Sequence, residues 1–267
     1  MPTEADLRAL LGRINGFALD MDGTLYLDGA PLPGAVEFVL RARASGRRLL
    51  FLTNNSSRTA AQYHQRLREL GFAPRPGEIL TSGDVAAQYL QERYPGRRVF
   101  VLGNRALREE LAGQGVRLAD RDPQVLLAAF DTELTYEKLC ILCDGARAGL
   151  PLIATHPDLN CPVQGGMIPD LGAFLALVKA ATGRDPDVIL GKPCAPIVAA
   201  ALRHLELPPE RVAMVGDRLY TDIRTGVDHG LVSILVFSGE AQPEELPASP
   251  WQPDAAVPGV ASLIPYL

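Results

Sequence analysis

The chain lacks the features of membrane-spanning, secreted and nucleic-acid-binding proteins. None of its apolar runs approaches the roughly 20 residues needed to cross a bilayer, and its N-terminus has no apolar signal-peptide core. Its 26 basic residues are outnumbered by 31 acidic ones, which gives a net charge of -5. Nucleic acids and anionic membranes usually call for a basic surface. We therefore expect a cytoplasmic protein with no nucleic-acid partner and no membrane partner.

Cysteine is scarce, and its spacing does not favour a zinc site. The four cysteines are Cys140, Cys143, Cys161 and Cys194. The first two form a C-x-x-C pair inside a segment that reads as a helix, and the other two are not paired. We therefore expect buried core thiols. A Walker-A sequence and a G-x-G-x-x-G are also absent, which weakens an NTPase or dinucleotide-binding interpretation.

The chain has enough apolar residues for a sizeable core, and apolar runs alternate with helical patterns along it. Hydrophobic residues make up 47% and charged residues 21% of the sequence, as in ordinary globular proteins. The length favours about two domains. Alternating strands and helices predict right-handed crossovers and a parallel sheet, hence an α/β fold. Expected strands are 17–19, 49–52, 78–81, 99–102, 125–130, 152–154, 188–190, 212–215 and 232–237; expected helices are 3–12, 33–44, 59–70, 84–94, 106–112, 136–148, 171–181, 195–205 and 220–228; residues 155–170 read as a loop.

The stretch GFALDMDGTLY, residues 16–26, places two carboxylates directly after an apolar strand. In a continuing strand Asp20 and Asp22 would point to the same face. They would lie at the carboxyl end of the strand, where ligands bind to open parallel sheets. Two carboxylates held this close repel each other unless a cation or a shared proton offsets the charge. This stretch therefore predicts a site of chemistry.

Other polar residues follow apolar strands in the same way. They are Thr53, Lys192 and Asp217, with Asp222 five residues beyond Asp217. Carboxylates are the hard oxygen ligands that Mg²⁺ takes, while a lysine and a hydroxyl can hold phosphate oxygens. One carboxylate can attack phosphorus and a second can transfer a proton. The pattern predicts a magnesium-dependent phosphoryl-transfer site.

These motifs resemble those of the haloacid dehalogenase-like phosphatases. D-x-D-G-T, an apolar strand ending in Thr-Asn, Gly-Lys-Pro and G-D-x-x-x-x-D occur in the family's order and span nearly the whole chain. The resemblance implies a Rossmann-like core, with Asp20 as nucleophile and Asp22 as general acid/base. It also implies that Lys192 orients the nucleophile and offsets charge. The implied ligands of Mg²⁺ are Asp20, Asp22 (through its backbone carbonyl), Asp217 and Asp222.

The resemblance also suggests residues that contact the substrate. The hydroxyl of Thr53 and the backbone N–H groups of Asn54 and Asn55, together with Lys192, would bind the phosphoryl group. The asparagines could also form the turn before the next helix, and the two roles are compatible. Relatives often carry A-T-N-P-D in the cap, where this chain has Ala154-Thr155-His156-Pro157-Asp158. His156 and Asp158 could contact the leaving group or belong to an ordinary loop.

The position of the long insertion predicts the subfamily. Few residues separate Asp22 from Thr53, whereas the segment between Thr53 and Lys192 is long enough for an α/β cap domain. With DMDGTLY, TNNSS and GKP, this arrangement is similar to the NagD-like, or p-nitrophenylphosphatase, subfamily. We expect a discontinuous core of residues 1–82 and 183–267, and a smaller cap domain of residues 83–182.

The resemblance implies a phosphomonoester hydrolase that forms an aspartyl-phosphate on a small phosphorylated metabolite. A sugar phosphate or a nucleoside monophosphate is the first expectation, phosphoglycolate and pyridoxal phosphate are alternatives, and p-nitrophenyl phosphate would be an artificial substrate. A dehalogenase, a phosphomutase and a catalytically silent phospholigand-binding regulator are rival interpretations. The sequence leaves a homodimer open.

Overall fold

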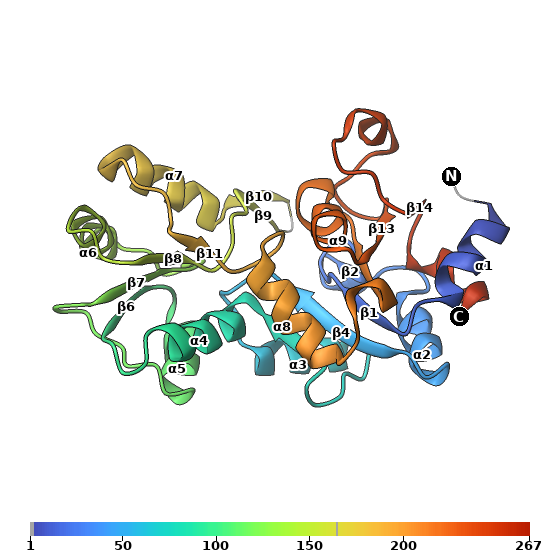
Figure 1. The fold of residues 1–267 in the computed structure, drawn as a ribbon, viewed down its shortest axis with the longest axis horizontal. Helices are drawn as coiled ribbons and strands as arrows, with labels where there is room; N and C mark the ends of the chain where they lie inside the picture. Colours follow the sequence, from blue (N-terminus) through green and yellow to red (C-terminus); the bar gives the residue numbers. More distant parts are fainter. Residues whose placement is uncertain (1–2, 164) are drawn as a thin grey trace. The chain divides into compact units, whose positions relative to one another are not determined.

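The computed structural model describes residues 3–163 and 165–267, which form two compact units (Figure 1). The first unit comprises residues 1–52, 63–80 and 197–267, and the second comprises residues 53–62 and 81–196. Within the described ranges, no helix is both long enough and apolar enough to cross a membrane.

The first unit is built on a six-stranded sheet. Its order is β14-β13-β12-β1-β4-β5, and β1 pairs in parallel with both β12 and β4. All four residues of β1 are buried, as expected for a strand covered on both faces. The strands are β1 (Gly16–Leu19), β4 (Arg48–Thr53), β5 (Ile79–Thr81), β12 (Val212–Gly216), β13 (Val232–Val236) and β14 (Ala255–Val257).

Helices cover this sheet and complete its core. The ring of Phe17 on β1 packs edge-on against Phe38 on α2, with the centroids 5.3 Å apart. Helix α1 begins at a capping box in which Thr3 and Asp6 bind each other's backbone N–H groups. The elements are α1 (Glu4–Gly12), α2 (Ala35–Ala44), α3 (Ala60–Glu69), α8 (Ala195–Leu205), α9 (Arg224–His229) and a small hairpin of β2 (Tyr26–Leu27) and β3 (Ala30–Pro31).

The second unit contains its own parallel sheet, inserted between the strands of the first. The order is β11-β8-β7-β6, and every neighbouring pair is parallel. The predicted α/β fold, with a second sheet between Thr53 and Lys192, is thus confirmed. The elements are β6 (Val99–Leu102), β7 (Val125–Ala128), β8 (Leu152–Ala154), β11 (Val188–Ile189), α4 (Ser82–Arg93), α5 (Arg105–Gly113), α6 (Tyr136–Arg147) and α7 (Leu171–Thr182).

The expected loop over residues 155–170 is wrong in its second half. Strands β9 (Asn160–Val163) and β10 (Gly166–Pro169) form an antiparallel hairpin. Pro162 and Pro169 argued against strands, but this two-stranded ribbon has no central ladder for a proline to interrupt. The expected helix over 220–228 is also divided, into a π-helical turn at Leu219–Ile223 and α9.

The four cysteines are free thiols. Cys143 is buried on helix α6, whereas Cys140, Cys161 and Cys194 are only partly buried. The expectation of buried core thiols is therefore wrong for these three.

Strand β11 lies in the second sheet although it falls after residue 182, where we placed the end of the cap. The boundaries of the two compact units do not by themselves define domain boundaries. The division into a core of 1–82 and 183–267 and a cap of 83–182 stays a prediction.

An acidic residue of the second unit is partly buried against other polar groups. Oε1 of Glu110 on α5 accepts a hydrogen bond from the amide of Ala60 at 3.3 Å, whereas Oε2 is buried and has no hydrogen-bond partner among the described residues. Burial, reinforced by the charge of Asp84 in the capping box of α4, raises the pKa of Glu110 from 4.5 to about 7. The folded state therefore binds a proton more tightly than the unfolded chain.

We predict that Glu110→Gln changes how stability depends on pH. In the wild type the free energy of unfolding falls as pH rises from about 4.5 to about 7, because the folded state must give up a proton that the unfolded chain has already lost. The variant should lack this fall and be the more stable protein above pH 7. Thermal unfolding across pH 4 to 8 measures the difference, with exposed Glu109→Gln as the control. Parallel pH curves for wild type and Glu110→Gln would contradict the prediction.

Candidate active site

Asp20 directly follows strand β1 and continues its pairing with β12. Its amide donates to the carbonyl of Val215 at 2.9 Å, and Leu19 lies opposite Val215 in the register of β1 and β12. Asp217 follows β12 directly. The parallel register therefore brings Asp20 and Asp217 to the same carboxyl edge of the sheet, as the sequence predicted.

Three carboxylates converge at this edge. One oxygen each of Asp20, Asp217 and Asp222 lie within 4.8 Å of one another. Asp217 and Asp222 are buried, with 3% and 1% of their surfaces exposed, whereas Asp20 is half-buried. Like charges at this separation repel strongly when water is largely excluded. Such a cluster is stable only where other groups offset the charge.

Backbone and hydroxyl donors hold these carboxylates in place. Oδ2 of Asp217 accepts from the amide of Glu240 at 2.7 Å, and Oδ1 accepts from the hydroxyl of Thr24 at 3.3 Å. Oδ2 of Asp222 accepts from the amide of Arg218 at 3.1 Å, across the π-helical turn that replaces the expected helix start. The turn thus points Asp222 back toward Asp217 and Asp20.

Glycines make room for the acidic side chains. A Cβ atom on Gly23 would overlap Oδ2 of Asp217, and Gly23 has a φ of +82°, which side-chain-bearing residues rarely adopt. A Cβ on Gly239 would also overlap Asp217, and one on Gly216 would overlap Asp222. The glycine of D-x-D-G-T therefore provides both a turn and the space for a carboxylate from another strand.

The donor set fits a hard divalent cation. Mg²⁺ prefers carboxylate and other oxygen ligands, and this cluster supplies three carboxylates from two adjacent strand ends. No histidine or cysteine belongs to the group, which disfavours zinc. Asp20, Asp217 and Asp222 could thus hold a metal, as the sequence predicted.

Asp22, the second aspartate of the motif, has a buried tyrosine as its partner. The hydroxyl of Tyr26 donates to Oδ2 of Asp22 at 3.2 Å. Burial, and then the charge of Asp22, raises the pKa of the Tyr26 phenol well above its ordinary range. The phenol therefore keeps its proton, and can donate to Asp22, well above neutral pH.

On the second unit, the side chain of Asn54 joins the predicted Lys192 and Asp158. Oδ1 of Asn54 accepts from the amide of Lys192 at 2.7 Å, and its Nδ2 donates to the carbonyl of Lys192 at 3.0 Å. The same Nδ2 lies 3.2 Å from both carboxylate oxygens of Asp158. The backbone carbonyl of Asn54 accepts from the hydroxyl of Ser82. This side chain is therefore fully used inside the protein.

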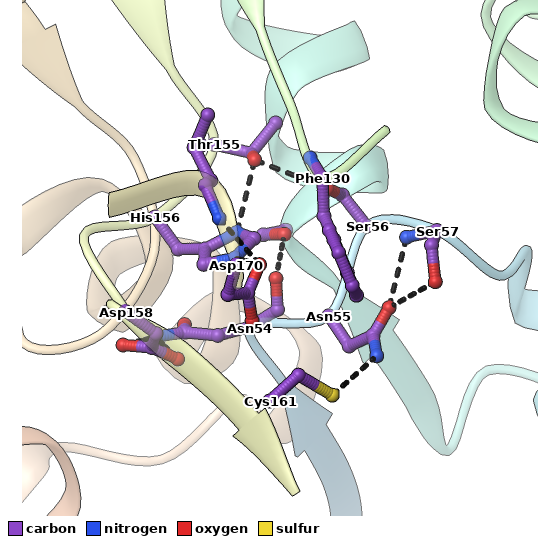
Figure 2. Close-up of polar contacts among 12 residues, drawn as sticks. Asn54, Asn55, Ser56, Ser57, Phe130, Thr155, His156, Asp158, Cys161 and Asp170 are labelled. Carbon is purple, nitrogen blue, oxygen red and sulfur yellow. Dashed lines mark hydrogen bonds and ion pairs between the residues drawn. The ribbon is translucent and has the colours of Figure 1, made fainter. Parts of the chain in front are cut away.

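Thr53 and Asn55 flank this residue and are bound locally. The hydroxyl of Thr53, the last residue of β4, accepts from the amide of Asn55 at 3.1 Å. The side chain of Asn55 accepts from the amide and hydroxyl of Ser57 and approaches Cys161, as Figure 2 shows. The segment after β4 is thus a structured turn.

His156 lies in a buried chain of hydrogen bonds (Figure 2). Its Nδ1 is 3.0 Å from the hydroxyl of Thr155, which is 3.1 Å from the hydroxyl of Ser56. Its Nε2 is 2.9 Å from Oδ1 of Asp170, the cap residue of α7. The histidine has no exposed surface, so both ring nitrogens contact protein groups.

The predicted site residues therefore form two groups, one on each unit. Asp20, Asp217 and Asp222 converge on the first, with Asp22 beside them. Asn54, Lys192 and Asp158 are joined on the second, with Thr53, Asn55 and His156 in the same unit. Sequence reasoning missed Tyr26, Thr24 and Asp170 as polar partners. Of these, Tyr26 and Thr24 carried a local signal, because they belong to the stretch that contains the D-x-D-G-T motif.

Comparison with known proteins identifies the family. A family model described as haloacid dehalogenase-like hydrolase matches residues 17–117, and a second HAD-hydrolase-like model matches residues 189–263. The chain is 36% identical over 231 residues to an acid sugar phosphatase of Staphylococcus aureus, covering 86% of this chain and 89% of that protein.

Solved structures agree. A 4-nitrophenylphosphatase from Thermotoga maritima is 41% identical, with a TM-score of 0.92 over 96% of this chain and 98% of that one. NagD from Escherichia coli K-12 is 31% identical, with a TM-score of 0.86 over 93% and 97%. The chain belongs to the haloacid dehalogenase-like hydrolases, in the NagD and p-nitrophenylphosphatase group. Within that family it is a phosphatase.

We predict that Asn54→Ala destabilises the protein by about 2 kcal/mol or more, because the change leaves buried groups of Lys192 and Asp158 without this partner. Urea unfolding measures the loss. Asn160→Ala on exposed β9 is the control and should change stability little. An unchanged unfolding midpoint for Asn54→Ala would show that the bridge contributes nothing.

We predict that Asp217→Asn weakens Mg²⁺ binding by about 10-fold or more, since it removes one charge from the acidic cluster. Calorimetric titration with Mg²⁺ alone measures the affinity without an activity assay. Asp228→Asn, which changes an exposed side chain on α9, should bind Mg²⁺ like the wild type. Equal affinity in all three proteins would place the metal elsewhere.

Proposed function

We propose that this phosphatase hydrolyses small phosphomonoesters, with sugar phosphates as the first expected class, in a Mg²⁺-dependent reaction. The observation that carries the proposal is the approach of Asp20, Asp217 and Asp222 within 4.8 Å at the end of β1 and β12, with Asp22 two residues further on. The names of the acid sugar phosphatase and the 4-nitrophenylphosphatase relatives support this substrate class.

In the first half-reaction a carboxylate oxygen of Asp20 attacks phosphorus. A bond forms between that oxygen and phosphorus while the bond from phosphorus to the ester oxygen breaks, and Asp20 becomes an aspartyl-phosphate. Asp22, in its protonated form, gives its proton to the departing oxygen, so that an alcohol leaves.

In the second half-reaction water attacks the phosphorus of the aspartyl-phosphate. Asp22, now a carboxylate, takes a proton from that water as the new bond forms. The bond to Asp20 breaks, inorganic phosphate departs, and Asp20 and Asp22 return to their starting states. One water molecule is consumed for each ester bond cleaved.

The remaining site residues would hold Mg²⁺ and bind the phosphoryl group. Asp20, Asp217, Asp222 and the backbone carbonyl of Asp22 would hold Mg²⁺, which when bound offsets the negative charge of the phosphoryl group. We assign phosphoryl binding to the hydroxyl of Thr53, the backbone N–H groups of Asn54 and Asn55, and the ammonium of Lys192, which also orients Asp20. The N–H of Asn55 would exchange its hydrogen bond to the hydroxyl of Thr53 for one to the phosphoryl group.

A role for His156 and Asp158 in selecting the leaving group stays a prediction. Because both ring nitrogens of His156 are bound within the protein, we expect it to act indirectly, by fixing the segment that carries Asp158. The hydrogen bonds from Asn54 hold Asp158 from the other side.

The rival functions are less well supported. A dehalogenase needs no acid where Asp22 stands, and phosphomutases usually carry their cap between the first two motifs. A silent regulator should have lost one of the reacting groups, and the sequence retains Asp20, Asp22, Lys192 and Asp217.

We predict that Asp20→Asn lowers Mg²⁺-dependent phosphate release from p-nitrophenyl phosphate by at least about 10³-fold, because an amide cannot form the acyl-phosphate. Release of inorganic phosphate and of p-nitrophenol is followed with the purified protein. Asp28→Asn, at an exposed turn position with φ of +49° that asparagine tolerates, should keep wild-type activity.

Activity that survives Asp20→Asn would overturn the mechanism, and no phosphate release by the wild type with Mg²⁺ would favour the silent regulator. A panel of sugar phosphates, nucleoside monophosphates, phosphoglycolate and pyridoxal phosphate tests the substrate class. Transfer of the phosphoryl group to a second sugar phosphate in place of water would indicate a mutase.

A further inference from the structure

Tyr26 is a large buried side chain that directs a polar atom at the reacting motif. None of its surface is exposed, and it ranks among the largest fully buried residues of the first unit. Its hydroxyl donates to Oδ2 of Asp22 at 3.2 Å. Ring packing alone would be served equally well by phenylalanine, so the hydroxyl needs another explanation.

The backbone between the two residues fixes their separation. The carbonyl of Met21 accepts from the amides of Leu25 at 2.8 Å and Tyr26 at 3.2 Å, and the amide of Gly23 donates to the carbonyl of Tyr26 at 2.9 Å. Asp22 and Tyr26 also form an isolated bridge. Main-chain hydrogen bonds thus close the loop and fix the positions of the backbone atoms that carry the side chains of Asp22 and Tyr26.

The ring itself is fixed from its face. The guanidinium carbon of Arg66 on α3 lies 4.9 Å from the centre of the Tyr26 ring, within the range of cation–π contacts. The buried Nε of Arg66 has no hydrogen-bond partner in the described part of the chain. The cation–π contact and the complete burial of the ring leave Tyr26 little freedom to turn its hydroxyl away from Asp22.

We propose that Tyr26 is a positioning residue for Asp22. The phenol O–H occupies Oδ2, which fixes the plane of the carboxyl group and favours Oδ1 as the oxygen that carries the transferred proton. This inference rests on the proposed function, because it assumes that Asp22 is the proton donor to the leaving group.

The leaving group provides the test, since the two substrate classes differ in their need for a proton. An alkoxide leaving from a sugar phosphate is strongly basic and requires protonation as the bond breaks, whereas p-nitrophenolate leaves readily without it. The ratio kcat/KM reports the steps up to formation of the aspartyl-phosphate. A misplaced Asp22 should therefore affect kcat/KM for a sugar phosphate far more than for p-nitrophenyl phosphate.

We expect Tyr26→Phe to lower kcat/KM for a hexose phosphate by about 10- to 100-fold and to change kcat/KM for p-nitrophenyl phosphate by less than about 3-fold. Partial unfolding lowers both values equally, so the ratio between the two substrates is independent of the folded fraction. Tyr89→Phe, which removes the hydroxyl of a half-buried tyrosine on helix α4 of the second unit, should leave the ratio unchanged.

Asp22→Asn separates failure of this inference from failure of the proposed function. If Asp22→Asn spares the hexose phosphate, the role of Asp22 is wrong. Suppose instead that Asp22→Asn lowers kcat/KM selectively for the hexose phosphate. If Tyr26→Phe then lowers kcat/KM equally for both substrates, or for neither, the positioning role alone is overturned. If Asp22 is the proton donor and Tyr26 positions it, Tyr26→Phe should not further change the ratio of kcat/KM between the two substrates in the Asp22→Asn background. The reason is that the two substitutions act on one proton transfer.

Discussion

Repulsion between carboxylates is the constraint on which the carboxyl edge of the six-stranded sheet depends. Two unit charges 4 Å apart interact by about 4 kcal/mol at an effective dielectric constant of 20, and Asp20, Asp217 and Asp222 approach almost this closely. The amides of Glu240 and Arg218 offset part of that cost. Because these donors belong to the fold, the carboxylates are oriented before any ligand arrives, which is the arrangement that electrostatic catalysis requires.

In the second unit, buried polar side chains must find hydrogen-bond partners, and these partners include neutral and charged groups. Asn54 binds both backbone groups of Lys192 and the carboxylate of Asp158, and His156 is bound at both ring nitrogens. Buried polar groups are costly only when unpaired, and a fully paired network is rigid. Residues that the sequence suggested as substrate contacts thus also form a hydrogen-bond network that stabilises the second unit.

The alternation of strands and helices, and the aspartates that end β1 and β12, were predictable because both signals are local. Strand periodicity fixes which residues are buried, and parallel pairing brings the strand ends together. The partner of Asn54 was not predictable, since Lys192 lies 138 residues away and both residues read as phosphate contacts. The hairpin β9–β10 was missed because its prolines suppress the usual strand signal, and the hydroxyl of Tyr26 because a buried ring is adequately explained by packing.

Three glycines at this edge of the sheet limit which substitutions the chain can accept. A single added methyl group at Gly23, Gly216 or Gly239 would occupy the volume of Asp217 or Asp222. Even alanine, usually the mildest replacement for glycine, would therefore displace a carboxylate at all three positions. Substitutions that alter substrate choice are easier to accommodate elsewhere in the chain than at this edge of the sheet.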